Sequence, residues 1–75
     1  MNWQEHIVTD STILVGKPII RGTRLSVEFI LDLLARSWSE EDIVRNYLVQ
    51  GDQIRACLAY ASWRLSEEKT YSVAA

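Results

Sequence analysis

Residues 26–68 read SVEFILDLLARSWSEEDIVRNYLVQGDQIRACLAYASWRLSEE, and their apolar side chains recur at the three- and four-residue spacing of helices. Ser26 is expected to cap a first helix, and Ser39, which precedes three acidic residues, a second. Gly51 is expected to open a third helix. Because the connecting turns are short, the pattern predicts a mainly α, three-helix helix-turn-helix domain, a skeleton that small bundles without DNA-binding activity share.

The apolar spacing also predicts which face of each helix lies inside the domain. The expected inward residues are Val27, Ile30, Leu31 and Leu34 in the first helix, Ile43, Val44, Tyr47 and Leu48 in the second, and Ile54, Leu58, Ala61 and Leu65 in the third. Trp38, in the turn after the first helix, is expected to close the core.

Two of the helices carry apolar side chains on the opposite face as well. On the third helix this outer face holds Ala56, Ala59, Tyr60 and Trp63, and on the first it holds Phe29 and Leu33. Aromatic residues are enriched at protein interfaces, and small monomers seldom expose such patches. We therefore expect a partner or homodimer interface at Phe29, Leu33, Tyr60 and Trp63. The alternative is that the N-terminal segment covers this face through Trp3 or Ile7.

Residues 1–25 follow a different pattern, in which turn-forming residues separate short apolar clusters. The clusters are Ile7-Val8, Ile13-Leu14-Val15 and Ile19-Ile20. We predict a small β element here, a hairpin that turns at Gly16-Lys17. Pro18 lacks an N–H group and is expected at the start of a strand or on an edge. Because a two-stranded hairpin is marginally stable, it should pack on the helices or on another chain.

The length of 75 residues predicts one domain, 1–75, with the β element and a basic loop in residues 1–25, the three helices in 26–68 and a tail in 69–75. Cys57 is the only cysteine, so no disulfide within the chain is possible. No apolar run approaches the length of a membrane span, and the N-terminus lacks the pattern of a signal peptide. We expect a cytoplasmic protein.

The charge pattern narrows the possible functions. A net charge of −2 is unlike that of an autonomous nucleic-acid binder, which usually carries a basic patch. His6 has no metal-ligand partner at a suitable spacing, and Cys57 has no nearby base. We therefore expect no metal, no cofactor and no enzymatic activity.

Basic side chains gather in one short stretch, which contains Lys17, Arg21 and Arg24. One interpretation is an anion site or docking loop, in which the two arginines act as forked donors to carboxylate or phosphate. The other is structural: Gly22 supplies a turn, Thr23 satisfies local backbone groups, and Arg24 pairs with an acid on a helix. A basic cluster of this size is common on protein surfaces.

The same stretch carries a resemblance to a known family. Gly16-Lys17-Pro18, Ile20-Arg21-Gly22-Thr23-Arg24-Leu25 and Val27 resemble the signature of the domain of unknown function 433 family. The likeness continues through Ser39-Glu40-Glu41-Asp42-Ile43 and residues 54–61. It implies a β element followed by a homeodomain-like helix-turn-helix. It also implies the antitoxin half of a prokaryotic toxin–antitoxin pair, whose toxin is a PIN-like ribonuclease.

The chain departs from the family pattern at three places. Ser37 stands where glycine usually ends the first helix, so it must adopt a positive φ or end the helix differently. Tyr47-Leu48 replaces Tyr-Pro, and Gln50-Gly51 stands where a threonine cap is common. We therefore expect an altered turn between the second and third helices.

Two functions follow as expectations. The first is an antitoxin-like protein, dimeric, that binds and neutralises a PIN-like ribonuclease toxin and can repress its own operon. The alternative is a stand-alone helix-turn-helix transcriptional regulator. For operator DNA, Gln53 and Arg55 are the expected base readers, with Lys17, Arg21 and Arg24 on phosphates.

The toxin contact has two expected locations. One is the loop Gly22-Thr23-Arg24, whose arginine could pair with the acids of a nuclease site. The other is the tail from Thr70 onward, through Tyr71 and Val73.

Overall fold

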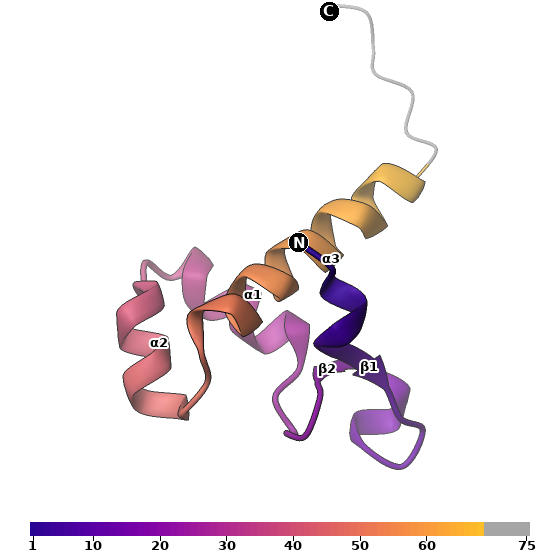
Figure 1. Ribbon diagram of the computed structural model, residues 1–75, viewed down its shortest axis with the longest axis horizontal. Helices are drawn as coiled ribbons and strands as arrows, with labels where there is room; N and C mark the ends of the chain where they lie inside the picture. Colours follow the sequence, from indigo (N-terminus) through magenta and orange to yellow (C-terminus); the bar gives the residue numbers. More distant parts are fainter. Residues whose placement is uncertain (69–75) are drawn as a thin grey trace, which may run out of the picture.

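A computed structural model describes residues 1–68 of the chain. It confirms a mainly α domain with three helices and a small antiparallel sheet at the N-terminal end (Figure 1). The helices are α1 (Val27–Ala35), α2 (Glu40–Tyr47) and α3 (Gly51–Glu67), and the strands are β1 (Ile7–Thr9) and β2 (Pro18–Ile20). Two short 3-10 segments, η1 (Trp3–Glu5) and η2 (Leu14–Gly16), flank β1.

The sheet is the predicted hairpin, but its connection is longer than expected. Ile7 pairs with Ile20 and Thr9 with Pro18, which begins β2 as predicted. The turn is not confined to Gly16-Lys17: the whole segment 10–17 joins the strands and contains η2. Asp10 starts this loop, because its carboxylate accepts the Thr12 N–H at 2.9 Å and the Thr12 hydroxyl at 2.6 Å.

The third apolar cluster of the N-terminal segment is therefore a loop and not a strand. Leu14 and Val15 have φ values of 50° and 55°, in the left-handed region, which is strained for a β-branched residue. Val15 is 95% exposed. The cluster looks like a strand in sequence because its residues have high β propensity, but it has no partner strand within residues 1–68.

Local capping defines the helix boundaries. The hydroxyl of Ser26 accepts the Phe29 N–H at 2.9 Å, as predicted for the start of α1. Helix α1 ends in a Schellman motif: Trp38 N–H donates to Leu33 O and Ser37 N–H to Leu34 O, each at 3.0 Å. Ser37 adopts a φ of 72°, which is the first of the two outcomes expected where it replaces glycine.

Helix α2 ends at a second left-handed residue. Leu48 has a φ of 57°, and its N–H donates to Val44 O at 3.1 Å. This geometry turns its side chain out of the domain, so Leu48 is 90% exposed and the prediction of an inward Leu48 is wrong. Val49, the next residue, takes the buried position instead.

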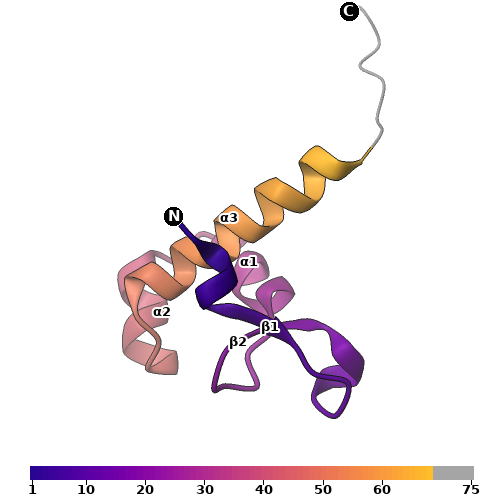
Figure 2. The same cartoon turned by 45° about the vertical axis from the view of Figure 1, so that its right-hand side comes forward.

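The core lies where the first half of α3 packs against α1, α2, η1 and β1. Its largest fully buried side chains include Ile20, Ile30, Ile43, Ile54 and Cys57. The second half of α3 runs out beyond the other elements (Figures 1 and 2). None of the helices described in residues 1–68 is long and apolar enough to cross a lipid bilayer.

The face of α3 that the core covers differs from the prediction. Ala56 and Cys57 are fully buried, whereas Leu58 and Leu65 are 47% and 63% exposed. On α1, Leu33 is buried in the core and not on an outer stripe. The reason is that α3 carries apolar residues on most of its circumference, so the spacing alone does not identify the side that meets α1 and the sheet.

Candidate functional site

The loop after β2 is closed by its own hydrogen bonds. The Thr23 N–H and hydroxyl both donate to Ile20 O, at 3.0 and 2.8 Å, and the Thr23 hydroxyl accepts the Leu25 N–H at 3.0 Å. Gly22 has a φ of 78°, which a side chain would strain. The structural interpretation of Gly22 and Thr23 is confirmed, and it fixes the backbone that carries Arg24.

Two of the three basic side chains of this region have partners within the chain, and these partners differ. Lys17 pairs with Glu28 at 3.2 Å. Arg21 donates to the carbonyl oxygens of Glu5 and Gln4, at 3.1 and 3.4 Å, and so ties η1 to the end of β2. These contacts give Arg21 a structural role, and they direct Lys17 and Arg21 away from a common point.

Arg24 is the exception. It is exposed and forms no ion pair or hydrogen bond with any group of residues 1–68, so the expected pairing with a helix acid is wrong. It lies at a pocket of about 310 Å³ that is mostly apolar. The lining residues are Leu14, Arg24, Leu25, Ser26, Phe29 and Tyr47.

Aromatic packing shapes this pocket, which we call the Arg24 pocket. Phe29 and Tyr47 meet edge to face with their ring centroids 5.2 Å apart, and this contact joins α1 to α2. Leu14 also lines the pocket; it is 42% exposed and precedes Val15, which is 95% exposed. A single unpaired cation therefore borders an apolar hollow and an apolar loop tip. Sequence reasoning missed Leu14 and Val15 as surface residues, because an apolar cluster with high β propensity is typical of a strand.

The two predicted base readers on α3 are engaged within the chain. The side-chain oxygen of Gln53 accepts the Gln50 N–H at 2.7 Å and so caps the helix. Arg55 pairs with Glu40 at 3.1 Å. A Cβ atom at Gly51 would collide with the carboxylate of Glu40, so glycine leaves room for this pair. Both side chains thus stabilise the α2–α3 turn.

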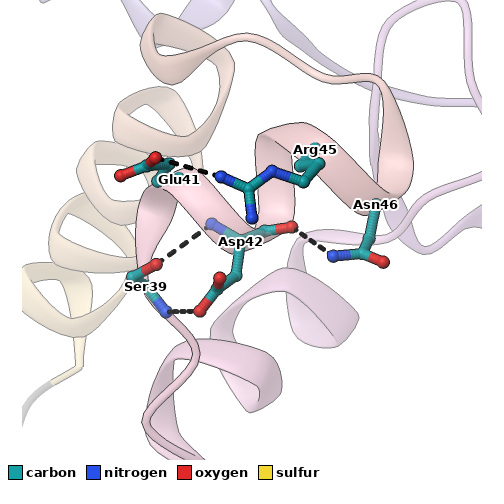
Figure 3. A network of polar contacts seen from close by, with 5 residues as sticks. All are labelled: Ser39, Glu41, Asp42, Arg45 and Asn46. Atoms are coloured by element: carbon teal, nitrogen blue, oxygen red, sulfur yellow. Dashed lines mark hydrogen bonds and ion pairs between the residues drawn. The ribbon is translucent and has the colours of Figure 1, made fainter.

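The acidic start of α2 is a capping structure, shown in Figure 3. Ser39 and Asp42 form a reciprocal capping box, with the Ser39 N–H donating to the Asp42 carboxylate at 3.2 Å and the Asp42 N–H to the Ser39 hydroxyl at 3.0 Å. The hydrogen bonds from Ser39 lower the pKa of Asp42 below its usual value. Arg45 forms a solvent-exposed ion pair with Glu41, one turn away, at 3.1 Å. This network supports the helix and does not bring carboxylates together for chemistry.

The predicted interface residues separate into two groups. Tyr60 and Trp63 pack against Trp3 of η1, with ring centroids 4.9 and 5.2 Å away, so the N-terminal segment covers this side of α3. Phe29 lines the Arg24 pocket, and Leu33 is in the core. Tyr71 and Val73 lie outside the described residues.

The titratable groups of residues 1–68 show no metal-binding cluster of histidine, cysteine and acidic side chains. Burial raises the pKa of the Cys57 thiol to about 12, which makes it a poor nucleophile. The carboxylate of Asp10 has a lowered pKa because Thr12 donates two hydrogen bonds to it.

Comparison with known proteins places the chain in one family. The model of the family described as "Protein of unknown function (DUF433)" matches residues 7–61, which include the sheet, the Gly22-Thr23-Arg24 loop and most of the helices. No curated protein and no solved structure gives a significant match. Because the match spans most of the chain, this protein belongs to the domain of unknown function 433 family.

Proposed function

We propose that this protein is an antitoxin-like interaction protein that binds and neutralises a PIN-like ribonuclease toxin, with Arg24 and the Arg24 pocket as its contact surface. One observation carries the proposal: Arg24 is an exposed cation without a partner in residues 1–68, on a rigid loop beside an apolar pocket. Lys17, Arg21 and Arg55, the other basic candidates, already have partners.

The chemistry of the surface suits such a target. A metal-dependent nuclease site is a cluster of carboxylates, and a guanidinium group can pair with a carboxylate through two parallel hydrogen bonds. An apolar side chain next to that cluster would fill the pocket beside Phe29 and Tyr47 and exclude water from the ion pair. Because the Thr23 hydrogen bonds hold the loop before binding, little conformational entropy is lost on association.

The test uses co-expression with the PIN-like nuclease that this proposal places in the neighbouring reading frame, together with measured affinity for a catalytically inactive form of that nuclease. Arg24→Ala should weaken binding by about 2–5 kcal/mol, which is the usual loss when one partner of a desolvated charge pair is removed. Growth rescue should fail with it. Arg36→Ala is the matched control, because Arg36 is exposed and pairs only with Asp32 on its own helix.

A truncation after Lys69 separates the loop from the tail. If the loop is the contact, the truncated chain keeps its affinity and Arg24→Ala loses it. Wild-type affinity and full rescue by a folded Arg24→Ala chain would overturn the assignment of the Arg24 pocket. If a chain that is truncated after Lys69 and also carries Arg24→Ala still binds with wild-type affinity and rescues growth fully, neither the loop nor the tail is the contact site.

A second candidate function is operator binding as a helix-turn-helix regulator. The observation in its favour is the tight turn between α2 and α3, with the Arg55 side chain 58% exposed near the start of α3. To reach DNA, Arg55 must leave Glu40, and the acidic first turn of α2 lies nearby. We expect weak, salt-sensitive binding to the DNA upstream of the gene in an electrophoretic mobility-shift assay. Arg55→Ala should abolish the shift, and an unchanged shift would argue against this function.

A further inference from the structure

Helix α3 has an apolar stripe that nothing in residues 1–68 covers. Leu58, Ala61, Ser62 and Leu65 follow one another at the spacing of a single helix face, and the two leucines are 47% and 63% exposed. Ile54 and Cys57 face the core, and Trp63 lies against Trp3. The stripe is therefore a further face of the helix, distinct from the faces that meet the core and Trp3, and it runs from the middle of α3 onto the half that projects from the domain (Figure 2).

A groove adjoins this stripe on the side that faces α1. It has a volume of about 400 Å³ and lies between the second half of α3, α1 and the start of β2. Its apolar lining consists of Pro18, Val27, Leu31, Tyr60, Ala61 and Leu65. Glu28 and Arg64, one charge of each sign, complete the lining.

The order of large and small residues in the stripe is nearly the same in both directions along the helix. From Leu58 to Leu65 the pattern is Leu-x-x-Ala-Ser-x-x-Leu, with small residues at its centre. An antiparallel copy centred between Ala61 and Ser62 would place Leu58 of one chain opposite Leu65 of the other. A two-fold interface requires this kind of self-complementarity, because the same patch is used twice.

Charge follows the same symmetry. The antiparallel register that pairs the leucines also brings Glu68, the residue that follows α3 in one chain, toward Arg55 of the other, at both ends of the stripe; the Arg55 side chain pairs with Glu40 of its own chain and is still 58% exposed. Both residues are exposed. The small residues at the centre allow the two helix axes to approach to about 8 Å, so that the leucines can enter the facing grooves.

We propose that a second copy of this chain covers the stripe, and that the protein forms a two-fold dimer in which the α3 helices pair in antiparallel orientation. The interface is distinct from the Arg24 pocket, so its failure would leave the proposed toxin contact untouched. A paired α3 has Leu58 and Leu65 covered, and this face of the helix cannot then lie in a DNA groove.

Sedimentation of the full chain from micromolar to near-millimolar concentration tests the assembly. We expect a monomer–dimer equilibrium that Leu58→Gln or Leu65→Gln weakens about 100-fold, because each copy loses a buried leucine. Both side chains are exposed within one chain, so circular dichroism should show unchanged folding at a concentration where the chain is monomeric. Leu48→Gln is the control: this leucine is 90% exposed but lies in the α2–α3 turn, and the dimer should persist.

Cysteine cross-linking tests the orientation. Ser62→Cys lies next to the two-fold axis and should give a disulfide-linked dimer under mild oxidation. Ser66→Cys should not, because antiparallel pairing separates the two copies of residue 66 by about 13 Å along the axis, which exceeds the reach of a disulfide. The native Cys57 is buried and does not compete.

Three results would overturn the proposal. The first is a monomer throughout the concentration range, and the second is a dimer as stable with Leu65→Gln as without it. The third is cross-linking of Ser66→Cys as fast as that of Ser62→Cys, which would indicate parallel helices.

Discussion

Replacing Ser37 with glycine should stabilise this protein. Ser37 has a φ of 72° at the end of α1, where the Schellman hydrogen bonds of Ser37 and Trp38 fix the backbone. A left-handed conformation costs an L-residue about 1–2 kcal/mol, and glycine avoids this cost. The greater freedom of glycine in the unfolded chain offsets about 0.5–1 kcal/mol. The net gain for Ser37→Gly is therefore about 0.5–1 kcal/mol, since the Ser37 side chain makes no hydrogen bond within residues 1–68.

Thermal unfolding followed by circular dichroism measures this gain. For a domain of this size, the expected increase in Tm is about 3–6 °C. All variants are compared at one protein concentration, because self-association would make Tm depend on it.

Two controls separate the φ effect from other causes. Ser37→Ala keeps the strain and should change the stability by less than about 0.5 kcal/mol. Ser66→Gly places glycine within α3, where it should cost about 0.5 kcal/mol. If Ser37→Gly lowers Tm, or if Ser37→Ala raises it equally, the left-handed strain at Ser37 is not the cause and the reasoning fails.

Three further predictions concern other parts of the molecule. Trp3→Ala should lower the free energy of unfolding by about 2–3 kcal/mol in urea titrations, because it removes the ring contacts that hold η1 to α3. An unchanged urea midpoint would contradict this packing. The pKa of Asp42 is lower in the folded than in the unfolded chain. The Asp42 carboxylate therefore contributes stability above the unfolded value near 3.8, and this contribution is lost as the pH falls below that value. Asp42→Asn should flatten this part of the acid unfolding profile, and an unchanged profile would count against the capping box. Cys57, with its pKa raised to about 12, should react with a thiol reagent only when the chain unfolds, and rapid labelling under native conditions would refute its burial.

The local features of this protein could be predicted from its sequence alone. Ser26 and Ser39 cap their helices, Pro18 begins its strand, and Ser37 takes the positive φ that was one of its two expected outcomes. Each of these features depends on groups within a few residues of one another, so the sequence contains both partners of the interaction. The turn role of Gly22 and Thr23 was predictable for the same reason.

Which side chains are free to contact a partner depends on how distant segments pack together. Arg21 and Arg24 are chemically alike in the sequence, but η1 returns to β2 and offers its carbonyl oxygens to Arg21 alone. Tyr60 was predicted to lie on the outer face of α3 and Leu65 on the inner face. In the structure Tyr60 is covered by Trp3 of η1, whereas Leu65 is 63% exposed because it lies on the projecting second half of α3. A helix that is apolar on most of its circumference has no preferred inner face of its own. The face that becomes buried is fixed by the elements that pack against it, and those come from distant parts of the chain.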